Sequence, residues 1–166
     1  MLKLFGALIL FAACVLLGFF YAERLRLRKN FLNAFISFLT DLRTRLRYES
    51  SDIKDLIFVC SYEKELSAIH SCFGKECSGT VEKIWEEACA VCKNEFSLNS
   101  EDLKVLTGFG SKLGASDVSG QLEHIDLYSE LLRKRLADAE GTLEKNAKLY
   151  RTLGFFAGAA AVIFIM

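Results

Sequence analysis

Hydrophobic residues run without interruption at both ends of the chain and recur periodically between them. The first uncharged stretch covers 19 residues, 4–22, and the second covers residues 153–166. At a helical rise of about 1.5 Å per residue, the first stretch nearly crosses the roughly 30 Å hydrocarbon core of a bilayer. The second gives only about 21 Å, so it would span if the bilayer thins or if Tyr150 and Arg151 snorkel. We predict a transmembrane helix over residues 4–22 and a C-terminal membrane segment over residues 153–166.

Basic residues flank both uncharged stretches. Lys3 precedes the first stretch, whereas four basic residues follow it closely and three precede the second. Because positively charged flanks are retained in the cytoplasm, we predict that residues 23–152 form a cytoplasmic helical bundle. Anionic headgroups attract juxtamembrane cations by about 1 kcal/mol each, which makes membrane lipids an expected partner. The candidate membrane-proximal basic residues are Arg24, Arg26, Arg28, Lys29, Lys148 and Arg151.

Two other interpretations of the N-terminal stretch stay open. A cleaved signal peptide has a shorter apolar run and a small-residue cleavage site, whereas this run continues into the basic block. The sequence Phe11-Ala12-Ala13-Cys14 faintly resembles a lipoprotein cleavage box, with Phe in place of the usual Leu. Metabolic lipid labelling of Cys14 would rule out the transmembrane interpretation.

Between the two ends, apolar residues recur at helical spacing. The chain has no proline and almost no strand-like alternation, which favours an all-helical fold. After the first uncharged stretch, one apolar stripe consists of Leu25, Leu32, Phe35, Leu39, Leu42 and Leu46. A second long helix, capped by Ser116-Asp117, carries the stripe Val118, Leu122, Ile125, Leu132, Leu136, Ala139, Leu143 and Tyr150. The predicted fold is all-α, a membrane-anchored antiparallel helical bundle in which two long helices continue into the terminal membrane segments.

Shorter helices are predicted between the two long ones. Cap residues at 50–52, 78–80 and 99–100 precede apolar runs, and a further run covers residues 63–73. In the run after residue 80, Trp85 is predicted to be the largest buried anchor, and the helix after the cap at 99–100 is predicted to end at about Phe109. Glycines then interrupt the chain at residues 108–114. This segment has no strand before it and lacks the Gly-Lys-Ser/Thr ending of a phosphate-binding loop. We therefore interpret its glycines as helix C-caps and a close-packed corner.

The formal net charge is zero, but the charges are unevenly distributed. Residues 48–132 contain sixteen acidic residues against seven lysines, whereas residues 24–47 contain seven basic residues against Asp41 alone. The acidic part is either a solvated surface or a docking face for a basic partner. The candidate docking residues are Glu82, Glu86 and Glu87, and no nucleic-acid partner is predicted.

Residues that could carry chemistry are few. The sequence Cys89-Ala90-Val91-Cys92 is a single CxxC without a second paired cluster, which favours buried thiols over a zinc site. Disulfides are disfavoured in a cytoplasmic compartment. The two histidines, His70 and His124, belong to no recognised nucleophile or general-base motif. We predict a protein that is not an enzyme, with no catalytic residue, metal site or cofactor.

Four segments along the chain match a known pattern. They are Met1–Ala7, the sequence Gly-Phe-Phe-Tyr-Ala at 18–22, Leu113–Asp117 followed by Gln121 and Ile125, and Lys148–Gly154. Together they resemble the stage III sporulation protein AB family, and the likeness covers the whole chain. One departure is Ser51-Asp52-Ile53, where the family usually has a Pro-Leu pair after the first long helix.

The resemblance implies a non-enzymatic inner-membrane platform in the secretion-like channel between mother cell and forespore of endospore-forming bacteria. Its cytoplasmic domain is then expected to be similar to the platform proteins of type II secretion and type IV pilus machines. Such platforms lie between a cytoplasmic ATPase and the parts beyond the membrane. The expected partners are other stage III sporulation A proteins, including the AA ATPase, on the mother-cell side of the engulfing membrane.

Two alternatives to this function stay open. An enzyme, such as a membrane-bound hydrolase, would need reactive side chains that converge in a pocket. A membrane-anchored coiled-coil adaptor or sensor, unrelated to secretion, would pair its heptads between chains, which crosslinks through cysteines at Leu39 and Leu132 would detect. The small-residue spacings 14–18 and 154–158 fit both a homo-oligomer and a hairpin within one chain.

Overall fold

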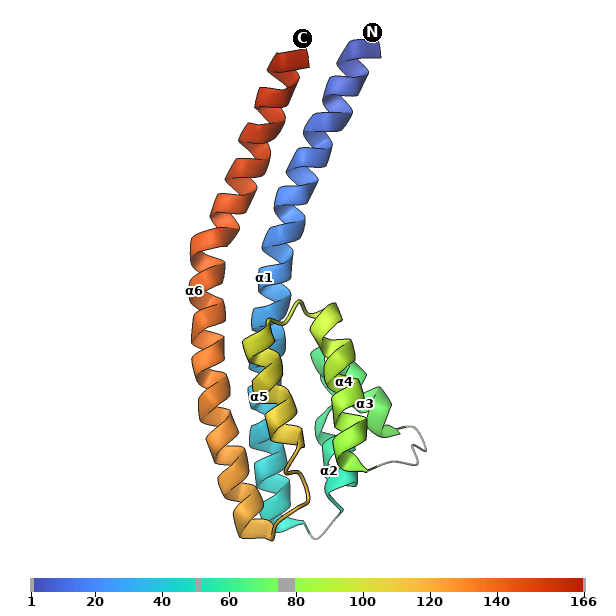
Figure 1. Ribbon diagram of the computed structural model, residues 1–166, viewed down its shortest axis with the longest axis vertical. Coiled ribbons are helices and arrows are strands. Elements are labelled where there is room, and N and C mark those ends of the chain that lie inside the picture. The colour runs from blue at the N-terminus through green and yellow to red at the C-terminus, as the bar shows by residue number, and fades with distance from the viewer. Residues whose placement is uncertain (1, 50–51, 75–79, 166) are drawn as a thin grey trace. The chain divides into compact units, whose positions relative to one another are not determined.

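The computed structural model describes residues 2–49, 52–74 and 80–165, apart from the side chains of residues 2–5, 7, 8, 10, 161, 162, 164 and 165. Every regular element in these ranges is helical, which confirms the predicted all-α class (Figure 1). The two long helices, α1 (Leu2–Tyr48) and α6 (Val118–Ile165), are the first and last elements of the chain, and the short elements lie between them in sequence. The short elements are α2 (Ile53–Cys60), the 3-10 turn η1 (Lys64–Leu66), α3 (Ser67–Gly74), α4 (Val81–Glu95) and α5 (Ser100–Gly110).

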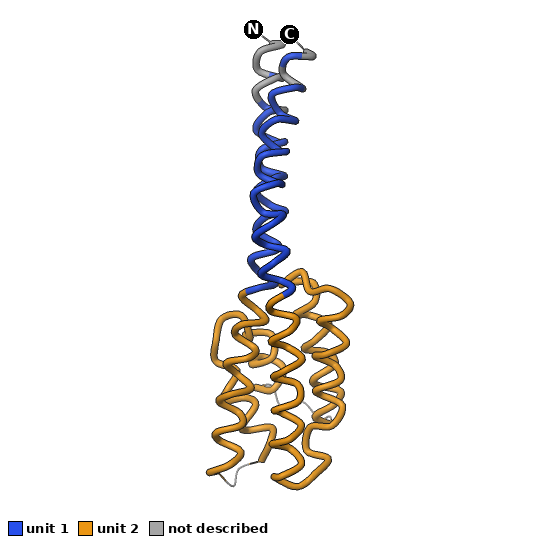
Figure 2. Tube along the Cα trace, turned by 90° about the vertical axis from the view of Figure 1, so that its left-hand side faces the viewer, with its two compact units in different colours: residues 1–29, 138–166 blue, residues 30–137 orange. Residues whose placement is uncertain are grey.

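The chain divides into two compact units (Figure 2). The terminal unit comprises residues 1–29 and 138–166 and therefore contains one part of α1 and one part of α6. The central unit comprises residues 30–137 and contains the remaining parts of both long helices and all the short elements. Each long helix thus contributes to both units.

In the terminal unit, the parts of α1 and α6 lie side by side in antiparallel order (Figures 1 and 2). The ring of Phe11 packs edge-on against Phe155 at 5.6 Å between centroids, and Tyr21 packs against Tyr150 at 5.7 Å. The antiparallel arrangement of the long helices that the two stripes predicted is therefore present in this unit.

The two helix backbones of the terminal unit touch at glycines. A Cβ atom at Gly18 would lie 2.6 Å from the carbonyl oxygen of Tyr150, and one at Gly154 would lie 2.8 Å from that of Cys14. Any larger residue would push the helices apart, because a Cβ atom cannot approach a backbone oxygen so closely. The small-residue spacings noted in the sequence therefore serve packing within one chain.

An aromatic core fills the central unit. Trp85 of α4 is fully buried, and its indole Nε1 donates a 2.8 Å hydrogen bond to the carbonyl oxygen of Leu106 in α5. The ring centroids of Phe35 and Phe38 in α1 and of Phe109 in α5 lie 5.3–6.3 Å from the ring centroid of Trp85. Such edge-on and offset ring contacts stabilise a core beyond the area they bury. The sequence correctly identified Trp85 as the main anchor of its helix.

The predicted stripe of α1 is confirmed in its middle and is wider than expected. Its fully buried members are Leu32, Phe35, Leu39 and Leu42, while Leu25 and Leu46 are half-buried. Phe31, Ala34 and Phe38 are buried as well, because the short helices cover a second side of α1 in the central unit. On α6, the prediction that Val118 belongs to the buried stripe is wrong, because its side chain is 52% exposed at the first turn of the helix.

Cap residues begin the short helices close to where the sequence placed them. The Asp52 side chain accepts a hydrogen bond from the Lys54 backbone N–H at the start of α2. At the start of α5, Asn99 and Asp102 form a reciprocal capping box. The single helix predicted over residues 63–73 is instead divided into η1 and α3. The predicted cap residues 50, 51, 78 and 79 lie outside the described residues.

The glycine-rich segment 108–114 begins in the last turn of α5 and forms the close-packed corner that was expected. A Cβ atom at Gly110 would overlap the Trp85 ring, so only glycine allows the indole to lie against α5. The helix ends at Gly110, one residue later than predicted.

Among the described residues, no helix is both long and apolar enough to cross a membrane. The predicted segments 4–22 and 153–166 fall partly on side chains that lie outside the described set. The membrane anchoring of the bundle therefore stays a prediction.

Candidate functional surfaces

All six candidate membrane-proximal basic residues lie in the terminal unit. Two of them rest on aromatic rings: the Arg24 guanidinium lies 4.8 Å from the ring centroid of Phe20, and the Arg151 guanidinium lies 5.2 Å from that of Phe19. Cation–π contacts at such distances hold a guanidinium against the ring face. These arginines are thus fixed where the uncharged stretches begin.

The other basic residues of this group differ in their surroundings. Arg26 forms a 3.8 Å ion pair with Glu23, and Lys29 forms a 3.3 Å ion pair with Glu140 across the two helices. Lys148 is exposed. Arg28 is only 7% exposed and interacts within the protein, so its side chain is not available at the surface as the sequence had suggested.

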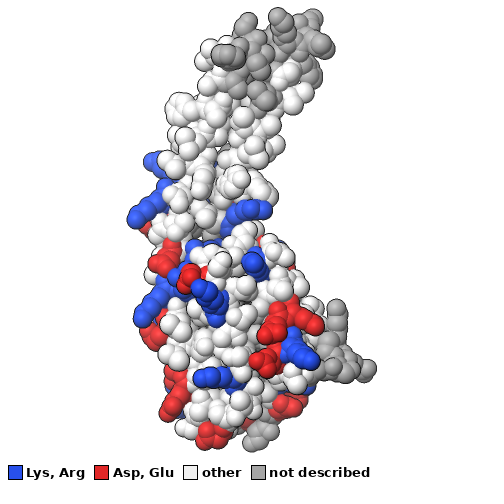
Figure 3. All heavy atoms as spheres, viewed as in Figure 1, with Lys and Arg blue, Asp and Glu red and all other residues white. Residues whose placement is uncertain are grey.

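The uncharged part of the terminal unit leaves large apolar side chains exposed. Those at least half exposed on α1 are Ile9, Leu16, Leu17, Phe19, Phe20 and Tyr21, and those on α6 are Leu149, Leu153, Phe155, Phe156 and Ile163. Figure 3 shows this part of the unit as a surface without blue or red spheres, next to a region where Lys and Arg side chains gather. A contiguous apolar surface of this kind marks a contact with lipid or with another protein.

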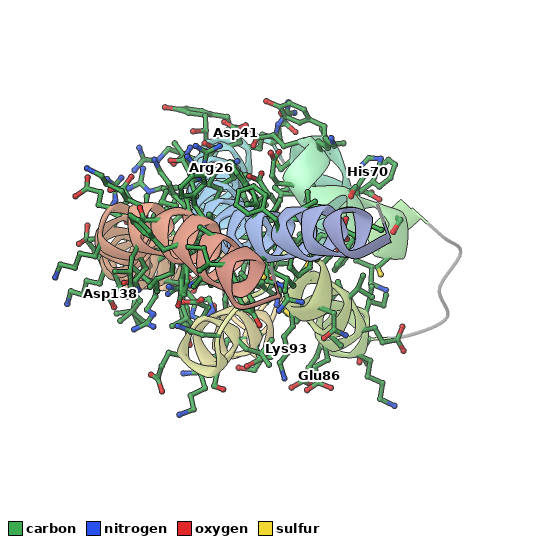
Figure 4. The ribbon with its side chains drawn as sticks, turned by 90° about the horizontal axis from the view of Figure 1, so that it is seen from above. Arg26, Asp41, His70, Glu86, Lys93 and Asp138 are labelled. Atoms are coloured by element: carbon green, nitrogen blue, oxygen red, sulfur yellow. The ribbon has the colours of Figure 1, made fainter. Side chains whose placement is uncertain are left out.

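The candidate acidic residues share the outer side of α4. Glu82, Glu86 and Glu87 are exposed, while Ile84 and Trp85 on the other side of the same helix are buried in the core. Figure 4 shows Glu86 pointing away from the helices. None of the three carboxylates forms an ion pair with the described residues. The face is therefore free to meet a basic partner, although Figure 3 shows acidic and basic side chains intermixed elsewhere on the central unit.

An ion pair with a fully buried carboxylate in the central unit was not foreseen in the sequence. Asp102 is fully buried and accepts a 3.1 Å hydrogen bond from the Arg135 guanidinium of α6. Its second carboxylate oxygen accepts from the Asn99 backbone N–H at 3.1 Å. Asp102 therefore serves both as helix cap and as the link between α5 and α6. Its position three residues after Asn99 suggested the cap, but nothing in the sequence paired it with a residue 33 positions away.

Some of the basic residues in the segment 24–47 belong to the central unit. Arg43 binds Asp126 of α6 through two hydrogen bonds of 2.7 and 3.2 Å, and Arg45 pairs with Glu49 at 3.0 Å. Their charges are matched within this unit.

Three buried thiols of the central unit, Cys60, Cys89 and Cys92, are held in their protonated form. Burial raises the pKa of Cys60 to about 11 and that of Cys92 to about 12, and it raises the pKa of Cys89 as well. Metal binding needs the thiolate, so burial works against a zinc site at the CxxC. No group of three or more His, Cys, Asp or Glu side chains in the described part of the chain could hold a metal ion. The thiol of Cys77 lies outside it.

Both histidines are engaged by backbone carbonyls. His70 Nδ1 lies 3.0 Å from the carbonyl oxygen of Phe58, and His124 Nε2 lies 2.9 Å from that of Phe109. His124 also lines an open groove of about 590 Å³ together with Lys112, Ser116 and Glu123. With its Nε2 committed to Phe109, His124 has a structural role in joining α5 to α6.

One of the four segments that suggested a family relationship lies between α5 and α6. The Gln121 amide group donates to the carbonyl oxygen of Lys112 at 3.0 Å and to the Ser116 hydroxyl at 2.9 Å. Gln121 is buried, as are Leu113 and Ile125. The Leu-Gly-x-Ser-Asp segment and the residues after it therefore build the connection between α5 and α6.

Comparisons with known proteins agree with this pattern. The family model for stage III sporulation protein AB matches residues 3–166. Stage III sporulation protein AB of Bacillus subtilis (strain 168) is 28% identical over 171 residues, which cover 100% of both chains. No solved structure shows significant similarity. Because the match extends over the whole helical chain, including both long helices and the corner between α5 and α6, the protein belongs to the stage III sporulation protein AB family.

Proposed function

We propose that this protein is a non-enzymatic platform of the inner membrane, which holds a cytoplasmic ATPase at the sporulation channel between mother cell and forespore. The observation that carries the proposal is the contrast within the terminal unit, where an exposed apolar surface ends at a group of basic residues. The hydrocarbon core of a bilayer would cover such an apolar surface, and its anionic headgroups would attract the basic residues beside it. The localisation that follows is the mother-cell side of the engulfing membrane, with the central unit in the cytoplasm.

The packing of the central unit supports the platform role. A platform has to transmit force or hold a partner without deforming, and the buried aromatic core with the Asp102–Arg135 link gives this unit a single fixed arrangement. The Nε2 atom of His124 is engaged by the Phe109 carbonyl oxygen, and the buried thiols are protonated. The unit is thus suited to binding rather than to catalysis.

The face of α4 is the proposed docking site for the AA ATPase of the same sporulation system. Glu82 and Glu86 lie one helical turn apart, and with Glu87 they present three unpaired carboxylates on one exposed side. A basic surface on a partner would neutralise them and speed the encounter.

The alternative of an adaptor that pairs its heptads between chains has less support. Leu39 and Leu132, which such an adaptor would use between copies, are both fully buried within the central unit of one chain. Opening that core would cost more than a surface contact between copies returns.

Two measurements on the full chain test the proposal. We expect the wild-type protein to resist carbonate extraction from membranes of sporulating cells, and a chain ending after Arg151 to be extracted more readily. We expect the double reversal E82K/E86K to reduce co-purification of the AA ATPase by tenfold or more, an order-of-magnitude loss typical of two interface charges.

The matched control reverses two exposed acids of α6, E123K/E130K, which changes the net charge equally. Equal loss of the ATPase in both variants would show that net charge, not the α4 face, drives recruitment. Complete extraction of the wild-type chain by carbonate would contradict the anchoring.

A further inference from the structure

The arginines at the edge of the uncharged stretches are the only cations of the described terminal unit found on aromatic rings. Arg24 lies one helical turn from Phe20, and Arg151 reaches from α6 to Phe19 of α1. Because Phe19 and Phe20 are consecutive on one helix, both guanidinium groups lie at nearly the same height along α1. Two positive charges are thereby brought to one level of this helix pair.

The nearby carboxylates do not neutralise these two charges. Glu23 pairs with Arg26, and Glu140 pairs with Lys29. Neither Arg24 nor Arg151 forms an ion pair with a described residue. The terminal unit therefore contains two kinds of cation: those in ion pairs, and two arginines whose charge no described carboxylate balances.

Arg151 also has a donor that the protein leaves unsatisfied. Its Nε atom is buried and has no hydrogen-bond partner among the described residues. A buried N–H without an acceptor is unfavourable, and guanidinium groups pair well with phosphate oxygens, which accept two N–H bonds at once. Because the Nε atom itself has no exposed surface, an anionic oxygen ligand can reach only the terminal nitrogens of this guanidinium.

The surroundings decide what kind of molecule would carry that oxygen. Phe19, Phe20 and Tyr21 are each more than half exposed beside the two arginines, and Tyr21 packs against Tyr150. A ligand here meets cations on one side and apolar side chains on the other. An anionic phospholipid has both parts, whereas free phosphate has only the first.

We propose that Arg24 and Arg151, with Phe19 and Phe20 beneath them, form a binding site for the phosphate group of an anionic phospholipid. The site rests on the proposed anchoring of the terminal unit in a bilayer and adds a preference for lipid type. The terminal N–H groups of the two guanidinium groups donate to the phosphate oxygens, while the acyl chains lie along the exposed apolar side chains of α1 and α6. The expected lipid carries a net negative charge, such as phosphatidylglycerol.

The test uses the full chain in nanodiscs of equal parts phosphatidylcholine and phosphatidylglycerol, extracted gently and examined by native mass spectrometry. The wild-type chain retains phosphatidylglycerol in preference to phosphatidylcholine. R24Q and R151Q each lower that preference by about fivefold, the effect expected for one juxtamembrane cation. R151K keeps the charge but not the planar fork, so it gives an intermediate value.

R26Q is the matched control, since it removes one cation from the same segment of α1 but from a pair with Glu23. Its preference stays within about twofold of the wild type, as exposed ion pairs contribute little. An equal loss in R24Q, R151Q and R26Q would overturn the site in favour of diffuse attraction. Insertion of the wild type without lipid preference would overturn this inference alone, whereas failure to enter the nanodisc would overturn the anchoring as well.

Discussion

The central unit packs aromatic rings around Trp85 and contains a buried ion pair. The terminal unit instead brings two helix backbones together at glycines and leaves its large side chains exposed. Burial from water stabilises the first arrangement. The second gains little from burial, because its apolar surface faces outward, and it depends on close backbone contact and on whatever covers that surface. The same two helices thus use different physics in their two parts.

Loss of the central indole should have the largest effect on this contrast. We expect Trp85→Ala to lower the free energy of unfolding by about 3–5 kcal/mol, because it leaves a large cavity and an unpaired Leu106 carbonyl. Chemical unfolding of the full chain in detergent measures this loss. It is followed by far-ultraviolet circular dichroism, because Trp85 is the only tryptophan and the variant has no tryptophan fluorescence to report unfolding.

Phe156→Ala is the counterpart in the terminal unit, where the ring is 63% exposed. Its effect in the same assay should stay within about 0.5 kcal/mol. Similar losses in both variants would mean that the exposed ring packs against the chain as tightly as the buried one.

The ion pairs of the two units sharpen the comparison further. Removing one partner of the buried pair, in Asp102→Ala, should cost about 3 kcal/mol, because the hydrogen bond from Arg135 is lost and α5 loses part of its cap. Removing one partner of the Lys29–Glu140 pair, in Glu140→Gln, should cost less than about 1 kcal/mol, because both side chains are more than a third exposed.

Added salt provides an independent check on these two pairs. Raising the ionic strength should leave the cost of Asp102→Ala nearly unchanged and reduce that of Glu140→Gln. A strong salt dependence of the Asp102 effect would argue against a buried link between α5 and α6.

The sequence was informative where a local rule applies. The stripe from Leu32 to Leu42, the anchor Trp85 and the cap at Asn99 all follow from helical periodicity or cap chemistry, and each was recovered. Val118 was misjudged, because periodicity cannot show that the partner helices end before a stripe does. The division of the third helix into η1 and α3 also has no signal in residue types alone.

Contacts between distant residues set the limit for the candidate surfaces. The six basic residues formed one class in the sequence, but the structure separates them into buried Arg28, the paired Arg26 and Lys29, exposed Lys148, and the two arginines on aromatic rings. The partners of Lys29 and Arg151 depend on which side chains of α1 and α6 face each other. Those of Arg24 and Arg26 lie one helical turn away on α1 itself. Spacing along one helix gives only the direction of each residue, not its partner on another.

A thiol provides a pH-dependent test of the central unit. Burial raises the pKa of Cys60 from 9.0 to about 11. Folded and unfolded chains both hold this proton below about pH 9, and above it the unfolded chain ionises first. Stability should therefore fall as the pH rises from about 9 to about 11, by about 2 kcal/mol from this group.

Comparison of variants isolates that contribution from the tyrosines and lysines that titrate in the same range. Cys60→Ala should lose less stability than the wild type between about pH 8 and about pH 11, whereas Cys14→Ala, in the terminal unit, should lose as much as the wild type. Chemical unfolding at both pH values gives the change in stability with pH for each variant, which is then compared with that of the wild type. An identical loss in Cys60→Ala would mean that the thiol is accessible to water in the folded chain.

The smallest expected effect separates backbone contact from helix propensity in the terminal unit. Gly18→Ala places a Cβ atom against the Tyr150 carbonyl, whereas Gly141→Ala places one in open space on α6. Alanine favours a helix over glycine by about 1 kcal/mol at either position, but at Gly18 overpacking of about 1–3 kcal/mol outweighs that gain. Spin labels attached to unnatural ketone residues at Phe20 and Phe156 should therefore report a distance longer by about 1 Å in Gly18→Ala, as the helix axes move toward an ordinary separation of about 8–10 Å. The distance in Gly141→Ala should match the wild type; a shift there, or none in Gly18→Ala, would mean that the glycine contact does not hold the two helices together.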